Sequence, residues 1–283
     1  LKIEGKFPKL ANCAVTMGKF DGIHRGHRKL VEKIRERKTL GEQAVLFAID
    51  ASSNMILTSQ ERASLLEKLG VEVALTAEQN EKVLNETGIC FMFAPVYHSS
   101  MKYAAPVRKE LGVRTVFNIL GPLSNPAAAT MQLLGVYNKE LAGTMAEVLS
   151  NLGVTRGVAV CGEDGLDEIT LTGETDVHEI RFGEITSYTI TPEQFGLSRC
   201  PLADLIGGTP EENAQITMDI LTGKETGAKR DVVLMNAGMA LYLGIDGISL
   251  AEGVEKAEEL IESGAALKKY EEFREATKAV AAK

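Results

Sequence analysis

The stretch that decides the fold is residues 157–168, which read GVAVCGEDGLDE. Its first five residues are apolar or glycine, which is typical of a buried strand. The glycines and acidic residues that follow indicate a turn. After Asn138, the residues up to about Leu152 are predicted to form a helix. A helix, a buried strand and a polar turn in this order indicate an α/β fold, in which ligands usually bind beyond the carboxyl ends of strands.

Three carboxylates lie within five residues of this turn, those of Asp164, Asp167 and Glu168. Acids this close together repel one another unless a cation joins them. Mg²⁺ is the natural partner, because it is a hard cation that binds carboxylates and substrate phosphates together. A second interpretation is an Asp-Gly surface turn whose acids are simply solvated. The residue types alone leave both interpretations open.

Downstream of the turn, short strands are predicted over 169–171, 177–182 and 186–190. The last third of the chain is predicted to be mainly helical. Thr209 and Ser249 each begin a capping box, with Pro210 at the first helical position of the earlier helix. Residues 231–243 are apolar nearly all round, which is typical of a fully buried helix.

Upstream, residues 1–63 predict a strand, a glycine-rich loop, a helix and a second strand. The strands are expected at 13–17 and 44–49, and a β-α-β unit of this length predicts that they are parallel. Capping boxes at Thr58 and Thr76 predict the starts of two further helices. Residues 89–94 suggest a strand or a buried segment.

The loop after the first strand reads MGKFDGIHRGH at residues 17–27. Glycines there allow a close approach to a ligand, and two histidines at a helix start suit phosphate oxygens. The loop resembles the nucleotidyltransferase domain of bifunctional riboflavin kinase/FAD synthetases. That resemblance implies a nucleotide-phosphate site, with possible contacts to ATP, made by Gly18, Phe20, Asp21, His24 and His27. A plain surface loop is the alternative interpretation.

Composition limits the function classes. The chain has 283 residues, 45% of them hydrophobic, and a formal net charge of −8. A nucleic-acid partner is therefore not expected, because such proteins carry basic surfaces. No apolar run reaches the roughly 18 residues that span a bilayer, and the first residues lack the layout of a signal peptide. Cys13, Cys90, Cys161 and Cys200 show no C-x-x-C spacing and predict reduced thiols in a cytoplasmic protein.

From about residue 64 onward the chain resembles anthranilate phosphoribosyltransferase. The resemblance covers 64–283 and rests on ordered phrases: FAP at 93–95, PVRKELG at 106–112, RTVFNILGP at 114–122, DGLDE at 164–168, GGTPEENA at 207–214 and NAGMAL at 236–241. It implies the α/β domain of a nucleoside phosphorylase/phosphoribosyltransferase-type fold. The expected architecture is this domain preceded by a Rossmann-like unit over 1–63.

The same resemblance implies transfer of a phosphoribosyl group from phosphoribosyl pyrophosphate to anthranilate. Asp167 and Glu168 would hold Mg²⁺, and Arg108 would grip the carboxylate of anthranilate through two hydrogen bonds. His98 and Lys102 precede that arginine and are expected to line the acceptor site. Ser99 and Ser100 stand where the family usually has Pro-Ala. A homodimer is one assembly that the resemblance allows.

Three motifs that the family carries upstream do not occur in this sequence: Gly-Thr-Gly-Gly-Asp, Asn-x-Ser-Thr and Lys-His-Gly-Asn-Arg. The resemblance therefore implies an incomplete pyrophosphate site. A join within residues 60–72 fits both families, and a gene fusion, a designed chimera and a mistaken joining of two genes would all produce it. Three hypotheses follow: a Mg²⁺-dependent phosphoribosyltransferase, a nucleotide-binding protein using His24 and His27, and a non-catalytic chimera.

Overall fold

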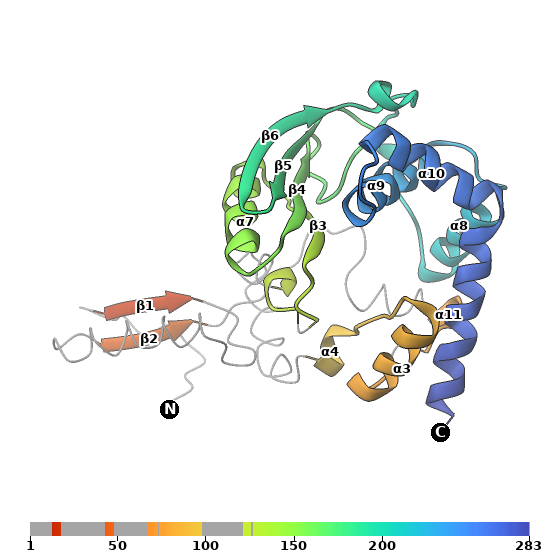
Figure 1. Ribbon diagram of the computed structural model, residues 1–283, viewed down its shortest axis with the longest axis horizontal. Coiled ribbons are helices and arrows are strands. Elements are labelled where there is room, and N and C mark those ends of the chain that lie inside the picture. The colour runs from red at the N-terminus through yellow and green to blue at the C-terminus, as the bar shows by residue number, and fades with distance from the viewer. Residues whose placement is uncertain are drawn as a thin grey trace. The chain divides into compact units, whose positions relative to one another are not determined.

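The computed structural model describes residues 13–17, 43–47, 67–72, 74–97, 121–125 and 127–282 (Figure 1). The chain divides into two compact units. One contains residues 1–53 and 98–124, and the other contains residues 54–97 and 125–283. The predicted boundary near residue 63 stays a prediction.

In the first unit, strands β1 (Cys13–Met17) and β2 (Gln43–Phe47) pair in parallel. Cys13 lies opposite Gln43 and Met17 lies opposite Phe47. Residues 18–42, which include the histidine-containing loop, lie outside the described residues. The Rossmann-like unit as a whole therefore stays a prediction.

The second unit is built on a four-stranded mixed sheet in the order β3-β4-β5-β6. Its strands are β3 (Met131–Gly135), β4 (Arg156–Gly162), β5 (Thr175–Arg181) and β6 (Glu184–Ile190). β3 and β4 are parallel and are connected through helix α7 (Lys139–Asn151), whereas β4, β5 and β6 are antiparallel neighbours. The predicted helix and buried strand around residues 139–161 are confirmed, and every residue of β4 is buried.

The sheet lies between two helical layers (Figure 1). Helix α7 packs on β4 and β5 through its buried face, which consists of Ala142, Met145, Ala146 and Leu149. On the opposite side lie α9 (Ala228–Gly244) and α10 (Leu250–Glu262), which pack on each other. The α/β fold predicted from the sequence is confirmed for this unit, with a mixed sheet.

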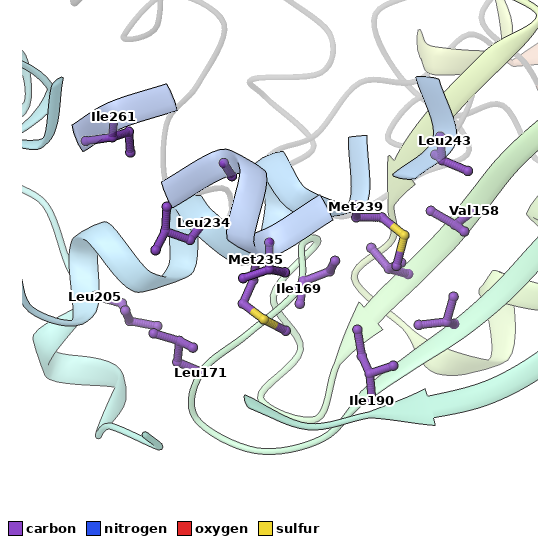
Figure 2. Close-up of a cluster of buried hydrophobic side chains, with 14 of the residues drawn as sticks. Val158, Ile169, Leu171, Ile190, Leu205, Leu234, Met235, Met239, Leu243 and Ile261 are labelled. Carbon is purple, nitrogen blue, oxygen red and sulfur yellow. The ribbon is translucent and has the colours of Figure 1, made fainter. Parts of the chain in front are cut away.

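The main hydrophobic core fills the space between the sheet and α9 (Figure 2). Val158 and Val160 of β4 meet Leu234, Met235 and Met239 of α9 there. All five side chains are at most 1% exposed. Burial of this extent is the main favourable term in folding and stabilises by roughly 1.5–3 kcal/mol for each large apolar side chain.

Of the four predicted capping boxes, the three on described residues are confirmed, and Thr58 lies outside the described residues. Thr76, Thr209 and Ser249 cap α3 (Ala77–Thr87), α8 (Pro210–Leu221) and α10, each through a capping box. The remaining helical elements are α4 (Ala94–Tyr97), the 3₁₀ turns η1 (Pro192–Phe195) and η2 (Leu202–Asp204), and α11 (Ala265–Ala281). A second, smaller core joins α3 to α11 through Val71, Leu75, Val83, Phe273, Ala276 and Val280. The predicted helical last third is confirmed.

One strand prediction is wrong. Residues 169–171 form no strand, although Ile169 and Leu171 are fully buried. Their backbone bonds instead to side chains and to a loop, because Ile169 pairs with Asn236 and the carbonyl of Leu171 accepts from the N–H of Cys200. Residues 89–94 are predicted to form a strand or a buried segment. Residues 89–93 form no strand; Ile89 is 43% exposed, whereas Phe91 and Phe93 are partly buried against the smaller core.

Helix α9 is less deeply buried than its apolar sequence predicts. Leu234, Met235, Met239 and Leu243 are buried, but Val233 is 40% exposed. A helix that covers one face of a sheet needs only part of its circumference to be apolar, and the rest meets its neighbours or solvent.

β5 and β6 form a hairpin with the two-residue turn Phe182-Gly183. Both residues have positive φ, 48° and 93°, as a type I′ turn requires. Phe182 is 78% exposed. A bulky residue in the left-handed region is uncommon, so this turn is shaped by its strands rather than by the preference of Phe182.

The antiparallel half of the sheet buries one carboxylate, that of Glu179. It accepts hydrogen bonds from Arg181 Nε at 2.7 Å and from the hydroxyls of Tyr242 and Tyr188 at 2.7 and 2.8 Å. Burial opposes ionisation, but these bonds outweigh it and lower the pKa of Glu179. Burial, together with the nearby charge of Glu179, raises the pKa of Tyr188. The group is therefore a fully paired polar cluster between the sheet and α9.

Arg156 ties the amino end of β4 to the carboxyl end of α9. Its guanidinium, only 6% exposed, contacts Asp246 at 2.5 Å and donates to the carbonyls of Tyr242 at 2.7 Å and Ile245 at 3.3 Å. A cation here satisfies carbonyls that lack partners within the helix and suits the helix dipole.

Candidate functional site: the acidic turn after β4

The carboxyl ends of the parallel strands β3 and β4 lie together at one end of the sheet. Gly135 pairs with Val160, and the N–H of Val136 donates to the carbonyl of Val160 at 2.8 Å. The acidic turn, defined here as residues 163–168, leaves β4 directly at this edge. The sequence predicts a ligand site at this place in an α/β fold.

The acidic turn lies directly against the last residue of β3. A Cβ built on Gly135 would come within 1.5 Å of the carbonyl oxygen of Asp167. Any side chain at position 135 would therefore displace the turn. Gly135 is the residue that lets the backbone of Asp167 reach the edge of the parallel pair.

Asp164 organises the turn from within. One carboxylate oxygen accepts from the N–H of Leu166 at 3.0 Å, and the other accepts from the hydroxyls of Thr170 and Thr172 at 2.6 and 2.7 Å. With three donors on one carboxylate, Asp164 is a structural acid. The turn is closed by the N–H of Gly162, which donates to the carbonyl of Leu166 at 3.0 Å.

The two predicted metal ligands, Asp167 and Glu168, are partly exposed on this turn. No hydrogen bond or ion pair joins the carboxylate of Asp167 to another described residue. Within the described parts of the chain, no three His, Cys, Asp or Glu side chains gather into a metal-binding group. Two adjacent carboxylates fit Mg²⁺, which is usually held by one or two carboxylates together with substrate phosphates and water.

The charges around the turn are mixed. Lys139, at the start of α7, pairs with Asp176 of β5 at 2.7 Å. Burial, with the neighbouring acids Asp176 and Asp164, raises the pKa of the Cys161 thiol.

Cys161, Cys90 and Cys200 are free thiols, in agreement with the prediction of reduced cysteines. Of the helices that the structure describes, none has the length and apolar character needed to cross a membrane.

The other predicted site residues lie outside the described residues. These are His98, Lys102 and Arg108 for the acceptor site and Gly18, Phe20, Asp21, His24 and His27 for the nucleotide-phosphate site. The sequence reasoning, in turn, missed Gly135 and Asn236. It also grouped Asp164 with the acids that a cation would join, whereas its carboxylate is bonded within the turn. A polar residue such as Asn236 within an otherwise apolar helix was the available signal.

Comparisons with known proteins identify the family to which the chain is similar. The sequence model of the family described as "Glycosyl transferase family, a/b domain" matches residues 52–267. The anthranilate phosphoribosyltransferase of Ruminiclostridium cellulolyticum is 55% identical over 213 residues, which is 75% of this chain and 62% of the relative. That of Endomicrobium trichonymphae is 53% identical over 215 residues, covering 76% of this chain and 64% of the relative.

Solved structures show the same similarity. Anthranilate phosphoribosyltransferase from Thermus thermophilus matches with a TM-score of 0.71 and 45% identity, over 76% of this chain and 64% of that chain. The Saccharomyces cerevisiae enzyme in complex with PRPP and Mg matches with a TM-score of 0.72 and 32% identity, over 77% and 63%. The chain thus spans a little under two thirds of the length of these relatives.

Proposed function

Because the chain belongs to the glycosyl transferase family characterised by this a/b domain, we propose that it acts in Mg²⁺-dependent transfer of a phosphoribosyl group from phosphoribosyl pyrophosphate to anthranilate, in tryptophan biosynthesis. Two relatives named anthranilate phosphoribosyltransferase are identical to this chain at more than half of the aligned residues, and a similar yeast structure contains PRPP and Mg. The observation that carries the proposal is the acidic turn at the carboxyl ends of β3 and β4.

In this reaction the amine nitrogen of anthranilate forms a bond to C1 of the ribose while the bond from C1 to pyrophosphate breaks. Bound Mg²⁺ would supply neutralisation of the phosphate charge. Asp167 and Glu168 would hold it from the acidic turn. By family resemblance, Arg108 would orient the carboxylate of anthranilate through two parallel hydrogen bonds, with His98 and Lys102 beside it.

The three motifs that the relatives carry upstream of this region are not in the sequence. We therefore expect weak substrate binding and little turnover, because positioning supplies a large part of such catalysis. A homodimer and a cytoplasmic location stay predictions of the family resemblance.

Isothermal calorimetry with phosphoribosyl pyrophosphate in the presence of Mg²⁺ tests the proposal. We expect measurable binding that weakens by at least ~100-fold in Asp167→Asn, since the metal loses a charged ligand. The matched control is Glu255→Gln, which neutralises an exposed acid on α10 and should leave affinity unchanged. No heat of binding at millimolar substrate would refute the proposal. Chromatography of anthranilate and its ribosylated product would measure turnover.

A second candidate function is nucleotide binding at residues 18–27. It is supported by the sequence of that loop and by β1, which ends immediately before the loop and pairs in parallel with β2. Titration with ATP, followed through the ring-proton NMR signals of His24 and His27, separates the two candidates. Shifts in these signals favour nucleotide binding, and unshifted signals with saturating ATP remove it.

A further inference from the structure

Asn236 makes an unusual contact for a residue in the middle of a helix. Its Oδ1 accepts a hydrogen bond from the N–H of Ile169 at 3.0 Å, and its Nδ2 donates to the carbonyl of the same residue at 2.9 Å. The two bonds reproduce what a neighbouring strand would offer to one residue. A single carboxamide on α9 thus satisfies both backbone groups of Ile169, 67 residues away in the sequence.

The orientation of this carboxamide is fixed by its own helix. Nδ2 also donates to the carbonyl of Val232, four residues earlier, at 2.9 Å. Both groups that accept from Nδ2 are carbonyl oxygens. If the carboxamide were rotated by 180°, its own oxygen would lie against these two carbonyl oxygens and no hydrogen bond could form. The contact is therefore directional, and it positions the backbone of Ile169 relative to α9.

Ile169 directly follows Glu168, so this contact sits at the end of the acidic turn. Asp164 anchors the other end through Leu166, Thr170 and Thr172. The side chain of Ile169 is fully buried among Met235 and other residues of the main core (Figure 2). Asp167 and Glu168 are consequently the two acids between a pair of anchors, one from within the turn and one from α9.

We propose that Asn236 is a positioning residue for the metal site: by holding Ile169 it fixes where Asp167 and Glu168 present their carboxylates to Mg²⁺ and a substrate diphosphate. This inference rests on the proposed function of the acidic turn. Groups that orient the ligands of a metal typically change its affinity by 10–100-fold when they are replaced.

The chain contains a matched control for this role. Asn213 of α8 makes the same pair of bonds, accepting from the N–H of Gly208 at 2.8 Å and donating to its carbonyl at 2.9 Å. It holds the loop before α8 rather than the acidic turn. Asn213→Ala therefore removes an equivalent two-bond contact of a buried asparagine without touching residues 163–169.

The first measurement uses the chain without metal or substrate. Amide hydrogen exchange at Ile169 should become at least ~10-fold faster in Asn236→Ala, because the N–H loses its only acceptor within the described residues. Asn213→Ala should leave that amide unchanged and release Gly208 instead. Unchanged exchange at Ile169 in Asn236→Ala would overturn the inference. Should Asn236→Ala fail to fold, Asn236→Ser keeps a hydroxyl at this position and gives the same comparison.

The second measurement is the affinity for phosphoribosyl pyrophosphate and Mg²⁺ by calorimetry, at a temperature where each variant is folded. We expect a loss of ~10–100-fold for Asn236→Ala and none for Asn213→Ala. Equal affinity in the unchanged chain and in Asn236→Ala would overturn only this inference and would leave the proposed function standing. No binding by the unchanged chain would overturn the proposed function, and the metal-positioning role with it.

Discussion

The two halves of the sheet treat an acidic residue differently. In the parallel half, formed by β3 and β4, an acid lies partly exposed beyond the strand ends. In the antiparallel half, formed by β5 and β6, an acid is buried within a strand. Asp167 lies partly exposed beyond β4, without a hydrogen-bond partner among the described residues. Glu179 lies within β5, with three hydrogen-bond donors around it. Parallel strands bring their carboxyl ends together, and a hairpin sends them to opposite ends of the sheet. Strand direction therefore separates the acid available to a ligand from the acid that stabilises the fold.

Gly135→Ala should disturb the parallel half most. The new methyl group would overlap the carbonyl of Asp167, so the acidic turn must move, at a cost of about 3 kcal/mol, and binding of Mg²⁺ with phosphoribosyl pyrophosphate should be lost. Urea unfolding and calorimetry measure the two effects. The matched control is Gly244→Ala, where a Cβ meets nothing within 4 Å. Full stability and affinity in Gly135→Ala would show that the turn does not depend on this contact.

Glu179→Gln should affect stability without affecting the site. Replacing the charged acceptor weakens the bonds from Arg181, Tyr188 and Tyr242, at a cost of about 2 kcal/mol. Urea unfolding should detect this loss, while calorimetry shows unchanged affinity. Glu184→Gln, at an exposed position of β6, is the control and should change neither. Weakened ligand binding in Glu179→Gln would contradict the separation of the two halves.

The pH dependence of stability sharpens the same contrast. The pKa of Glu179 is lowered in the folded chain, so its contribution is present above the unfolded pKa of about 4.3 and is lost as the pH falls through the folded value. The difference in unfolding free energy between the unchanged chain and Glu179→Gln should therefore shrink from about pH 6 to about pH 3. A constant difference over that range would mean that the Glu179 charge is not what stabilises the cluster.

Phe182→Asn should give the smallest effect, and in the opposite direction. Asn tolerates the left-handed backbone of this position, and an Asn-Gly pair is preferred in type I′ turns. A gain of about 0.5 kcal/mol in unfolding free energy is expected, with no change in ligand affinity. A loss of stability would indicate that the exposed ring of Phe182 makes contacts of its own.

The sequence predicts those parts of the fold that depend on neighbouring residues. Thr76, Thr209 and Ser249 begin helices because their hydroxyls reach backbone N–H groups three residues later. Residues 157–161 form a strand because a continuous apolar run suits a strand buried on both faces. The acidic turn could be placed because it follows that strand.

What could not be predicted depends on partners distant in the sequence. Ile169 and Leu171 have the apolar spacing of a strand, but the bonds of Ile169 go to Asn236 on a helix. The sequence also could not show that Asp164 is a structural acid while Asp167 is left for a ligand. That difference arises because Thr170 and Thr172 fold back and donate hydrogen bonds to Asp164. Gly135 gives no sign in the sequence that the carbonyl of Asp167 will lie against it.

Helix α9 is hydrogen-bonded to the segment that contains β4 and the acidic turn at two points. The number of helical residues between these points therefore has to match the distance between them. Arg156, at the start of β4, holds the carbonyl of Tyr242, whereas Asn236 holds Ile169 just after the acidic turn. Inserting one residue between positions 236 and 242 would rotate one attachment relative to the other by about 100° and shift it by about 1.5 Å. Both attachments cannot then form together, so the number of residues in this segment is constrained even where their identities are free to vary.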